Sequence, residues 1–598
     1  MESKVLKKRE EIQDKDKWSI NEIYSNDEVW EKEYKELQEE APKLKEFEGK
    51  LGDGETLIKY FEVNEKVSRK AEKIYVYAHL RCDEDTSNTK YQAMMNKIDA
   101  YMAEYATYTA YVVPEILSLP DGTIEKQMEE LKGLEPYKFL LENILKEKPH
   151  VLDKKEEELL AAASDCLDAP SSIHNIMTNA DMKFGNIKDE DGEEVELTEG
   201  NYSSFIKSKD REVRKEAFKG LFKEYKAFEN TLATTLSSSI KVFNFGARVR
   251  NYNSALEASL KPNDIPLEVY TNAIKTIGDN LSSLHRYVGL KKKLLGLDEM
   301  HMYDLYVPVI EIPKERVEFD DAVKMAIEGL QPLGKEYLDI FQEGINGGWI
   351  DKYINKGKRG GAYSWGGYDT KPYVLLNYNY ELNDVSTLVH EMGHSIHSYY
   401  SRKEQSYYYA GYTLFCAEVA STTNEALLIH HLINKETDKK KKLYLINQEL
   451  EQIRTTVFRQ LMFAEFELYT HESFEKGIPL TAEDYNAKWH ELNVKYFGPE
   501  MVVDSEIDVE WSRIPHFYSD FYVYQYATGY AAASAFAKSI LNKEPNAVEK
   551  YVGFLKSGGS DYPIEILKKA GVDMTTPKPL EATIDRFNEL LDMLEKEI

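Results

Sequence analysis

The sequence predicts a mainly α-helical globular protein, and three observations lead to this prediction. Apolar residues recur three and four positions apart, with charged residues between them, over long stretches of the chain. Segments with the composition of strands are few, and the clearest of them is rich in Tyr, Val and Leu. Apolar residues make up 42% of the 598 residues, which is enough for a large buried core.

Helical periodicity is strongest in four stretches of the chain: 28–48, 211–246, 437–470 and 578–597. Three stretches predict strands, namely a hairpin with a polar turn in 182–197, one strand in 301–309 and two strands joined by a turn in 361–380. The chain contains neither a repeat of fixed period nor a Gly/Ser-rich linker. We divide it near residue 200, into a helical N-terminal region, 1–200, and a catalytic region, 201–598.

The composition argues against several classes of protein. With 76 basic and 104 acidic residues the formal charge is −28, which argues against binding to nucleic acids or to anionic membranes. No run of about 18 apolar residues could span a membrane. The first residues lack the apolar core of a signal peptide. The three cysteines, Cys82, Cys166 and Cys416, are too few and too scattered for a disulfide framework, so we expect a cytoplasmic protein.

The stretch "LVHEMGHSIHSYY", residues 388–400, predicts a metal site on a helix that runs from about 385 to 400 and is capped by Asn383 or Asp384. His390 and His394 are four residues apart, so they share one helix face and can bind one Zn²⁺. Glu391 lies beside the first histidine, where its carboxylate can act as the base of a zinc peptidase. The alternative is an ordinary surface helix that happens to carry two histidines.

A third ligand is expected from the next predicted helix, 413–433. Glu418 lies 24 residues after His394 among apolar neighbours, where a carboxylate is usually paired or ligating. Glu425 is seven residues further on, on the same face, and can accept a hydrogen bond from a ligating histidine. His397 is less suitable as a ligand, because seven helical residues span about 10.5 Å; we expect it to support a ligand or to pack in the core. His430 and His431 are taken as structural.

These motifs resemble those of a known family. "HEMGHSIHSYY", followed by the Glu of "FCAEVASTTNE", resembles the thimet oligopeptidase family of zinc peptidases. "GAYSWGGYDTKPYVLLNY" and "IPHFYSDFYVYQYATG" resemble its oligoendopeptidase F branch, and "WSINEIY" and "LTEGNYSSFIKSKDREVR" are similar too. The resemblance implies a two-lobed helical zincin with a deep substrate channel and a small β-sheet beside the zinc helix. It also implies one Zn²⁺ per chain, held by His390, His394 and Glu418, with Glu391 as the base that hydrolyses internal bonds of short unstructured peptides.

The segment 513–530 is the expected source of groups that stabilise the oxyanion of peptide hydrolysis. It contains His516 and five tyrosines, of which Tyr522, Tyr526 and Tyr530 are spaced as on one helical face. An aromatic packing stripe is the alternative for any single tyrosine. The resemblance implies that His516, Tyr522 and Tyr526 contact the substrate, while another register favours Tyr524. The chain departs here from the Gly-Gly-Tyr pattern of larger relatives.

The strand that begins at Gly361 and Ala362 could bind an extended peptide along a free edge. Two other modes of peptidase action are alternatives. An aminopeptidase of the gluzincin type would show a G-x-M-E-N-like segment, which the sequence lacks, whereas a carboxypeptidase stays open. A peptide-binding protein without activity would be expected to have lost a ligand or the base, and all four residues are intact. The sequence makes no prediction about oligomeric state.

Overall fold

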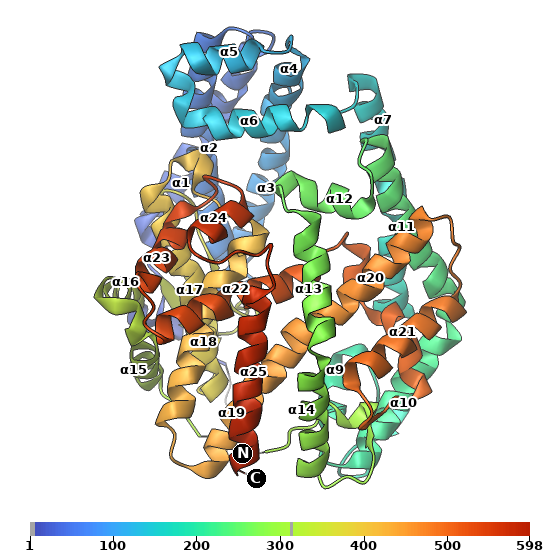
Figure 1. The fold of residues 1–598 in the computed structure, drawn as a ribbon. Coiled ribbons are helices and arrows are strands. Elements are labelled where there is room, and N and C mark those ends of the chain that lie inside the picture. The colour runs from blue at the N-terminus through green and yellow to red at the C-terminus, as the bar shows by residue number, and fades with distance from the viewer. Residues whose placement is uncertain (1–5, 311–314, 598) are drawn as a thin grey trace. The chain divides into compact units, whose positions relative to one another are not determined.

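The architecture is seen in a computed structural model, which describes residues 6–310 and 315–597. Contacts within the chain divide it into two units. Unit 1 comprises residues 1–149, 314–431 and 536–571, and unit 2 comprises residues 150–313, 432–535 and 572–598. Helices make up most of both units (Figure 1), as the sequence predicted. The predicted division near residue 200 stays a prediction.

Unit 1 begins with a bundle of helices and continues with the helices around the sheet and the motif. The first group is α1 (Asp27–Glu40), α2 (Gly54–Glu84), α3 (Thr89–Thr109), α4 (Val112–Ser118), α5 (Thr123–Glu130) and α6 (Lys138–Lys146). The second group is α15 (Phe319–Leu330), α16 (Gly334–Asn346), α17 (Leu382–Glu404), α18 (Leu414–Lys435), α22 (Tyr524–Leu541), α23 (Ala547–Ser557) and α24 (Pro563–Lys569). The two boundaries near residues 431 and 535 fall inside α18 and α22.

A three-stranded sheet lies beside α17 in unit 1. Its strands are β4 (Ile350–Tyr353), β5 (Tyr363–Trp365) and β6 (Tyr373–Tyr378), in the order β4-β6-β5. The strands β5 and β6 are antiparallel, with Ser364 opposite Val374, which confirms the two strands predicted in 361–380. Tyr373 and Leu375 of β6 are buried in the same apolar cluster as the side chains of the N-terminal helices. The sheet therefore joins those helices to the part of the chain that carries the motif.

Unit 2 contains the remaining helices, several of which are labelled in Figure 1. They are α7 (Lys154–Leu167), α8 (Ala169–Ile176), α9 (Glu199–Phe205), α10 (Arg211–Ala227), α11 (Glu229–Val249), α12 (Ala255–Leu260), α13 (Leu267–Asp279), α14 (Leu281–Leu294), α19 (Lys439–Ile453), α20 (Arg459–Glu475), α21 (Ala482–Phe497) and α25 (Lys578–Glu597). The predicted hairpin is present as β1 (Asn186–Lys188) paired with β2 (Glu194–Glu196).

Two predicted elements of unit 2 differ from the structure. The strand expected in 301–309 is reduced to β3 (Met300–His301), which pairs with β7 (Met501–Val502). It ends there because Asp304 accepts the backbone N–H of His301 and closes a 3₁₀ turn. The helix expected over 437–470 is interrupted by a π-helical turn, Arg454–Phe458, between α19 and α20.

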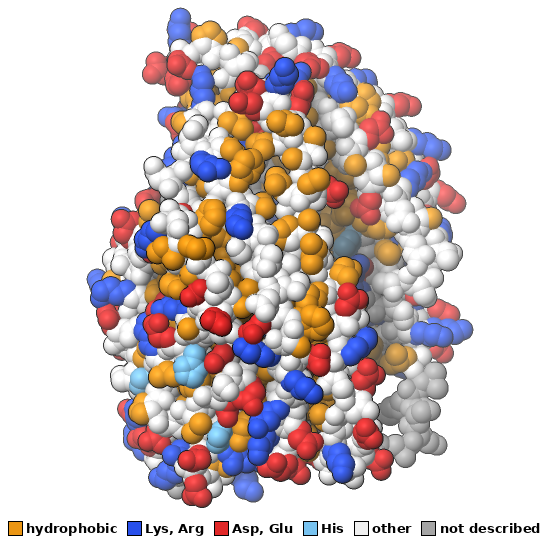
Figure 2. Space-filling model, turned by 90° about the vertical axis from the view of Figure 1, so that its right-hand side faces the viewer, with side chains coloured by type: hydrophobic (Ala, Val, Ile, Leu, Met, Phe, Trp, Pro, Cys, Tyr) orange, Lys and Arg blue, Asp and Glu red, His pale blue; other side chains and the backbone are white. Residues whose placement is uncertain are grey.

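The face drawn in Figure 2 carries both charged and apolar side chains. Acidic and basic side chains are interspersed in its lower part and along its margins, and apolar side chains gather in its upper and middle part. Such mixed charge is typical of a surface exposed to water. Within the described ranges, no helix combines the length and the apolar character that crossing a membrane requires.

Candidate metal centre and catalytic groups

Helix α17 presents the motif because its start and its buried face are both fixed. Asp384 accepts the backbone N–H groups of Asn379 and Glu381, at 2.8 and 2.9 Å, which closes the N-terminus one turn earlier than predicted. Glu381, and neither Asn383 nor Asp384, thus occupies the N-cap position, while Asp384 closes the first turn from inside the helix. The buried stripe of the helix consists of five apolar side chains, Val385, Leu388, Val389, Met392 and Ile396. This stripe fixes the rotation of the helix and so the direction of its histidines.

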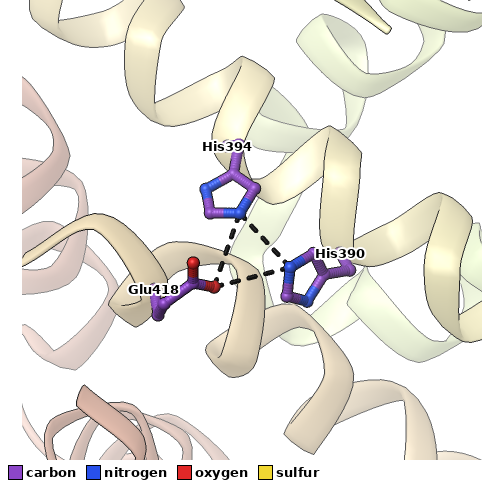
Figure 3. Close-up of side chains that lie close together, drawn as sticks. All are labelled: His390, His394 and Glu418. Atoms are coloured by element: carbon purple, nitrogen blue, oxygen red, sulfur yellow. Dashed lines mark hydrogen bonds and ion pairs between the residues drawn. The ribbon is translucent and has the colours of Figure 1, made fainter. Parts of the chain in front are cut away.

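His390, His394 and Glu418 converge on one point (Figure 3). The two Nε2 atoms of the histidines are 3.2 Å apart, and Glu418 Oε2 lies 3.4 Å from His390 Nε2 and 3.5 Å from His394 Nε2. In a tetrahedral zinc site with bonds of 2.0–2.1 Å, neighbouring ligand atoms are about 3.3–3.4 Å apart. The triangle therefore has the dimensions of three corners of such a site, and the residues fit a metal.

Helices α17 and α18 approach closely enough to form this triangle because residue 393 is a glycine. A Cβ atom at Gly393 would lie 2.7 Å from the Cα of Ser421 and 2.9 Å from the carbonyl oxygen of Ala420. Asn424, which is fully buried, adds a tie by donating from Nδ2 to the carbonyl of Val389 at 2.9 Å. No role was predicted for Gly393 or Asn424. The sequence gives little indication of their roles, because only the packing of the two helices reveals them.

The carboxylates around the triangle are oriented by further hydrogen bonds. Glu425 Oε2 lies 3.2 Å from His390 Nδ1, and Ser386 donates to the other oxygen of Glu425 at 3.1 Å. Ser421 donates to Glu418 Oε2 at 2.9 Å. Glu425 therefore lies beside the nitrogen of His390 that is not part of the triangle. The two serines were not predicted, since a serine in a helix gives no pattern of its own.

The charges of this cluster shift the pKa values of its members. Burial lowers the pKa of His390, but the neighbouring carboxylates, Glu425 first, outweigh it and raise the pKa to about 9. Burial would raise the pKa of Glu418, whereas the two histidines outweigh it and lower the pKa to about 2. Glu391 is 7% exposed, and burial raises the pKa of its carboxyl above the ordinary value. The cluster thus attracts a cation and contains one carboxylate that holds a proton readily.

His397 is part of the aromatic core. Its ring is 1% exposed and stacks on Tyr412, with centroids 3.8 Å apart and planes inclined by 5°. Phe554 of α23 lies 5.1 Å from it on another side. Burial lowers the pKa of His397 to about 3. Of the two alternatives left open for this residue, its surroundings favour packing.

His516, Tyr522 and Tyr526 come together in unit 2. Tyr526 Oη lies 3.3 Å from His516 Nε2, the rings of His516 and Tyr522 are nearly parallel at 5.9 Å, and the two tyrosine rings meet edge-on at 5.4 Å. Tyr524 is instead 2% exposed, with its ring 5.1 Å from that of Tyr270. The expected helical face through Tyr522 is wrong, because α22 begins only at Tyr524.

The turn before α22 is held in an unusual conformation. Phe521 has a φ of +49°, which a side chain with a Cβ adopts at a cost in energy. Its N–H donates to Glu467 at 2.9 Å, and its ring lies 4.6 Å from that of His471. Burial raises the pKa of the Glu467 carboxyl, and it raises the pKa of the neighbouring Asp520 to about 7. These contacts hold the backbone that leads from His516 to Tyr526.

The strand expected to meet a peptide lies at the end of the sheet, as β5. Gly361, just before it, has a φ of +82°, which favours glycine, and its carbonyl accepts from Asn377 at 2.7 Å. Ala362 follows and leads into Tyr363, which opposes Leu375 of β6. Ser364 and Ser395 of α17 share a hydrogen bond of 2.8 Å. The strand is therefore fixed against the helix that carries His390 and His394.

Comparisons with known proteins agree over almost the whole chain. A family model described as Peptidase family M3 matches residues 204–586, and one described as Oligopeptidase F matches residues 115–184. Oligopeptidase PepF of Bacillus subtilis is 49% identical over 592 residues, which cover 99% of this chain and 88% of that protein. The plasmid-encoded oligoendopeptidase F of Lactococcus lactis subsp. cremoris is 41% identical, with 99% of each chain covered. A crystal structure of oligoendopeptidase-F from Enterococcus faecium is 40% identical, has a TM-score of 0.73 and covers 96% of this chain and 99% of that one.

Proposed function

The chain belongs to peptidase family M3 and is a metallo-oligopeptidase, and from this premise we propose that one Zn²⁺, held by His390, His394 and Glu418, serves the hydrolysis of internal bonds in short unstructured peptides. The observation that carries the proposal is the triangle of ligand atoms with edges of 3.2, 3.4 and 3.5 Å. Two imidazoles and one carboxylate form a common ligand set of catalytic zinc. When bound, zinc supplies Lewis acidity to the carbonyl and to the attacking water.

Glu391 acts as the general base and then as the general acid. It is adjacent to the ligand His390, so its carboxylate borders the same space without being needed as a ligand. Its raised pKa, which burial causes, suits a group that takes a proton from water and passes it to the leaving amine. Glu425 supports this step indirectly, because its hydrogen bond to Nδ1 leaves Nε2 of His390 directed at the metal position.

His516 and Tyr526 are the proposed donors to the oxygen of the scissile carbonyl. Burial lowers the pKa of His516, so the ring is neutral near pH 7 and acts through a single N–H. The contact of 3.3 Å with Tyr526 links the two groups, and Tyr522 packs against both rings. Donors that strengthen as negative charge develops on the oxygen lower the barrier to hydrolysis.

The substrate is proposed to lie as an extended strand along β5. Backbone groups at Gly361 and Ala362 begin this edge, where added strand pairing gives affinity without a strict sequence preference. Cys82, Cys166 and Cys416 are free thiols, which fits the reducing cytoplasm as the place of action.

One experiment tests the metal and the base separately. Purified protein is analysed for metal, and cleavage of an internally quenched peptide is followed before and after chelation. Glu391→Gln is then expected to keep its zinc and to lose about 10²-fold or more in kcat. Near-normal turnover of this variant would exclude Glu391 as the base. Release of terminal residues alone, seen by mass spectrometry of the products, would instead indicate an exopeptidase.

A further inference from the structure

Unit 2 contains a cavity of about 530 Å³ that the proposed reaction does not use. Its walls come from six places in the sequence: α9, α10, α14, the stretch after β3, the region from α19 to α20, and the 3₁₀ segment Ser505–Arg513. Helices α9, α14 and α19 are labelled in the lower part of Figure 1. A volume of this size accommodates a small organic molecule.

The lining of this cavity is basic, although the chain carries a charge of −28. Five basic side chains line it against two acidic ones; they are Lys207, Lys291, Arg454, Arg459 and Arg513 against Glu451 and Glu510. Arg459 pairs with Glu510 at 2.7 Å, and Arg513 pairs with Glu199 at 2.7 Å. Lys207 is exposed, so the excess of buried positive charge lies at the remaining group, Lys291 and Arg454 with Glu451.

Two buried cations share the single carboxylate of Glu451. Lys291 Nζ lies 2.8 Å from its Oε1, while Nε and Nη2 of Arg454 donate to its Oε2 at 3.0 and 2.6 Å. Lys291 and Arg454 are each 1% exposed. Burying two positive charges against one negative charge leaves one charge uncompensated, which is costly in a protein interior. Consistent with this, burial lowers the pKa of Lys291.

Two buried polar atoms of the cavity wall have no hydrogen-bond partner among the described residues. They are the donor Nη1 of Arg454 and the acceptor Oε2 of Glu510. Buried polar atoms nearly always have a partner, so such a pair in one cavity wall indicates a ligand. Arg454 begins the π-helical turn Arg454–Phe458, and such turns are frequent at functional sites. Its guanidinium lies 4.9 Å from the ring centroid of Tyr306.

The rest of the lining combines polar side chains, such as Asn447 and Thr455, with an apolar part. The apolar part includes Ile206, Phe218, Met302 and Val307, beside the ring of Tyr306. A ligand that matches all three features has one negative charge, one N–H donor and an apolar body. The end of a peptide with an apolar last residue has this chemistry, because its carboxylate bears one charge and its last amide is a donor.

We propose that this cavity binds the carboxyl-terminal end of short peptides with an apolar last residue, the carboxylate at Arg454 and Lys291 and the amide N–H at Glu510. Each cut of an internal peptide bond creates one new carboxyl terminus, so the products of this enzyme carry the group. That identification of the ligand as a product rests on the proposed function, whereas binding itself does not depend on catalysis.

The test is calorimetric titration of the metal-loaded full chain with N-acetylphenylalanine and with its neutral amide. The acid is expected to bind once per chain in this cavity. The amide should bind at least about tenfold more weakly, because the amide lacks the charge-assisted hydrogen bond. Ser203, exposed on α9 at the cavity wall, allows a variant that fills the space and leaves the buried ion pairs intact. Ser203→Trp should abolish binding in this cavity, and Ser204→Trp, at the exposed neighbour outside the lining, should not.

Two results would overturn the proposal. One is equal binding of the acid and the amide. The other is unchanged binding of the acid to Ser203→Trp; complete loss of that binding on chelation would then place the ligand at the metal. Arg454→Gln provides a second variant, since it leaves Glu451 paired with Lys291 and removes the excess charge; it should bind the acid at least about tenfold more weakly. Melting temperatures show whether each variant is folded. If Arg454→Gln does not fold, the result with Ser203→Trp decides the test.

Discussion

Replacing Gly393 by alanine should weaken the metal site, although the same change usually stabilises a helix. Alanine is favoured over glycine by about 1 kcal/mol inside a helix. At Gly393, however, the new Cβ atom would meet backbone atoms of α18, with 2.7 Å to Cα of Ser421. Backbone atoms cannot rotate away as the end of a side chain can, so the helices themselves must separate.

The size of the effect follows from this contact. Ordinary van der Waals contact begins at 3.4 Å, so raising 2.7 Å to 3.4 Å requires a movement of about 0.7 Å between α17 and α18. Metal–ligand distances tolerate only about 0.2 Å. Because His390 and His394 lie on α17 and Glu418 on α18, we expect metal affinity to fall at least about tenfold. Overpacking should also lower the free energy of unfolding by about 1–3 kcal/mol before the gain in helix propensity.

The assay is a competitive zinc titration with a chromophoric chelator, together with thermal unfolding of the metal-free protein. Gly553→Ala is the matched control, since this glycine lies within α23 and a Cβ there would meet no atom within 4 Å. Gly553→Ala should leave the metal affinity unchanged and the melting temperature unchanged or slightly higher. If Gly393→Ala bound zinc as tightly as the original protein, the close approach of the helices would not be what sets the triangle.

Three further predictions address other groups. Glu425→Gln should lower zinc affinity by about 10–100-fold with the ligands intact, measured by the same titration; an unchanged affinity would remove Glu425 from the support of His390. His516→Ala should lower kcat by about 10²-fold with KM nearly constant in a quenched-peptide assay, whereas a drop in melting temperature alone would indicate a packing role. Burial raises the pKa of Asp520 to about 7, so the folded state keeps a proton that the unfolded chain releases near pH 4. The free energy of unfolding therefore loses a contribution as pH rises from about 4 to 7, and Asp520→Asn should flatten this slope in urea titrations; an unchanged slope would contradict the assignment.

The sequence predicts the residues whose chemistry is local. Two histidines four apart and a carboxylate 24 residues later indicate a metal site, because a helix and one loop suffice to relate them. Their ligand atoms indeed lie within 3.5 Å of one another. The helix predicted over 578–597 was likewise found as Lys578–Glu597, whereas the stretch 211–246 is divided between α10 and α11.

Features that depend on packing between distant segments were not predicted. The roles of Gly393 and Asn424 become visible only when α17 packs against α18, and the cavity in unit 2 is assembled from six stretches of chain. The predicted helical face through Tyr522 was wrong, because the strained turn at Phe521 places the start of α22 after Tyr522. Glu467 holds this turn, and no sequence pattern shows that contact. The strand expected in 301–309 was cut short by one side chain, Asp304.

The interrupted course of unit 1 affects when the enzyme can become active during synthesis. Helix α17 packs against α23, where Phe554 lies 5.1 Å from the ring of His397. About 130 residues separate Glu418 from the start of α23 at Ala547. At about 5–20 residues per second, the ribosome needs roughly 6–25 s to deliver this partner after the last ligand. A nascent chain therefore has an incomplete scaffold for the proposed ligands, and we expect peptidase activity to appear only after α23 has been synthesised.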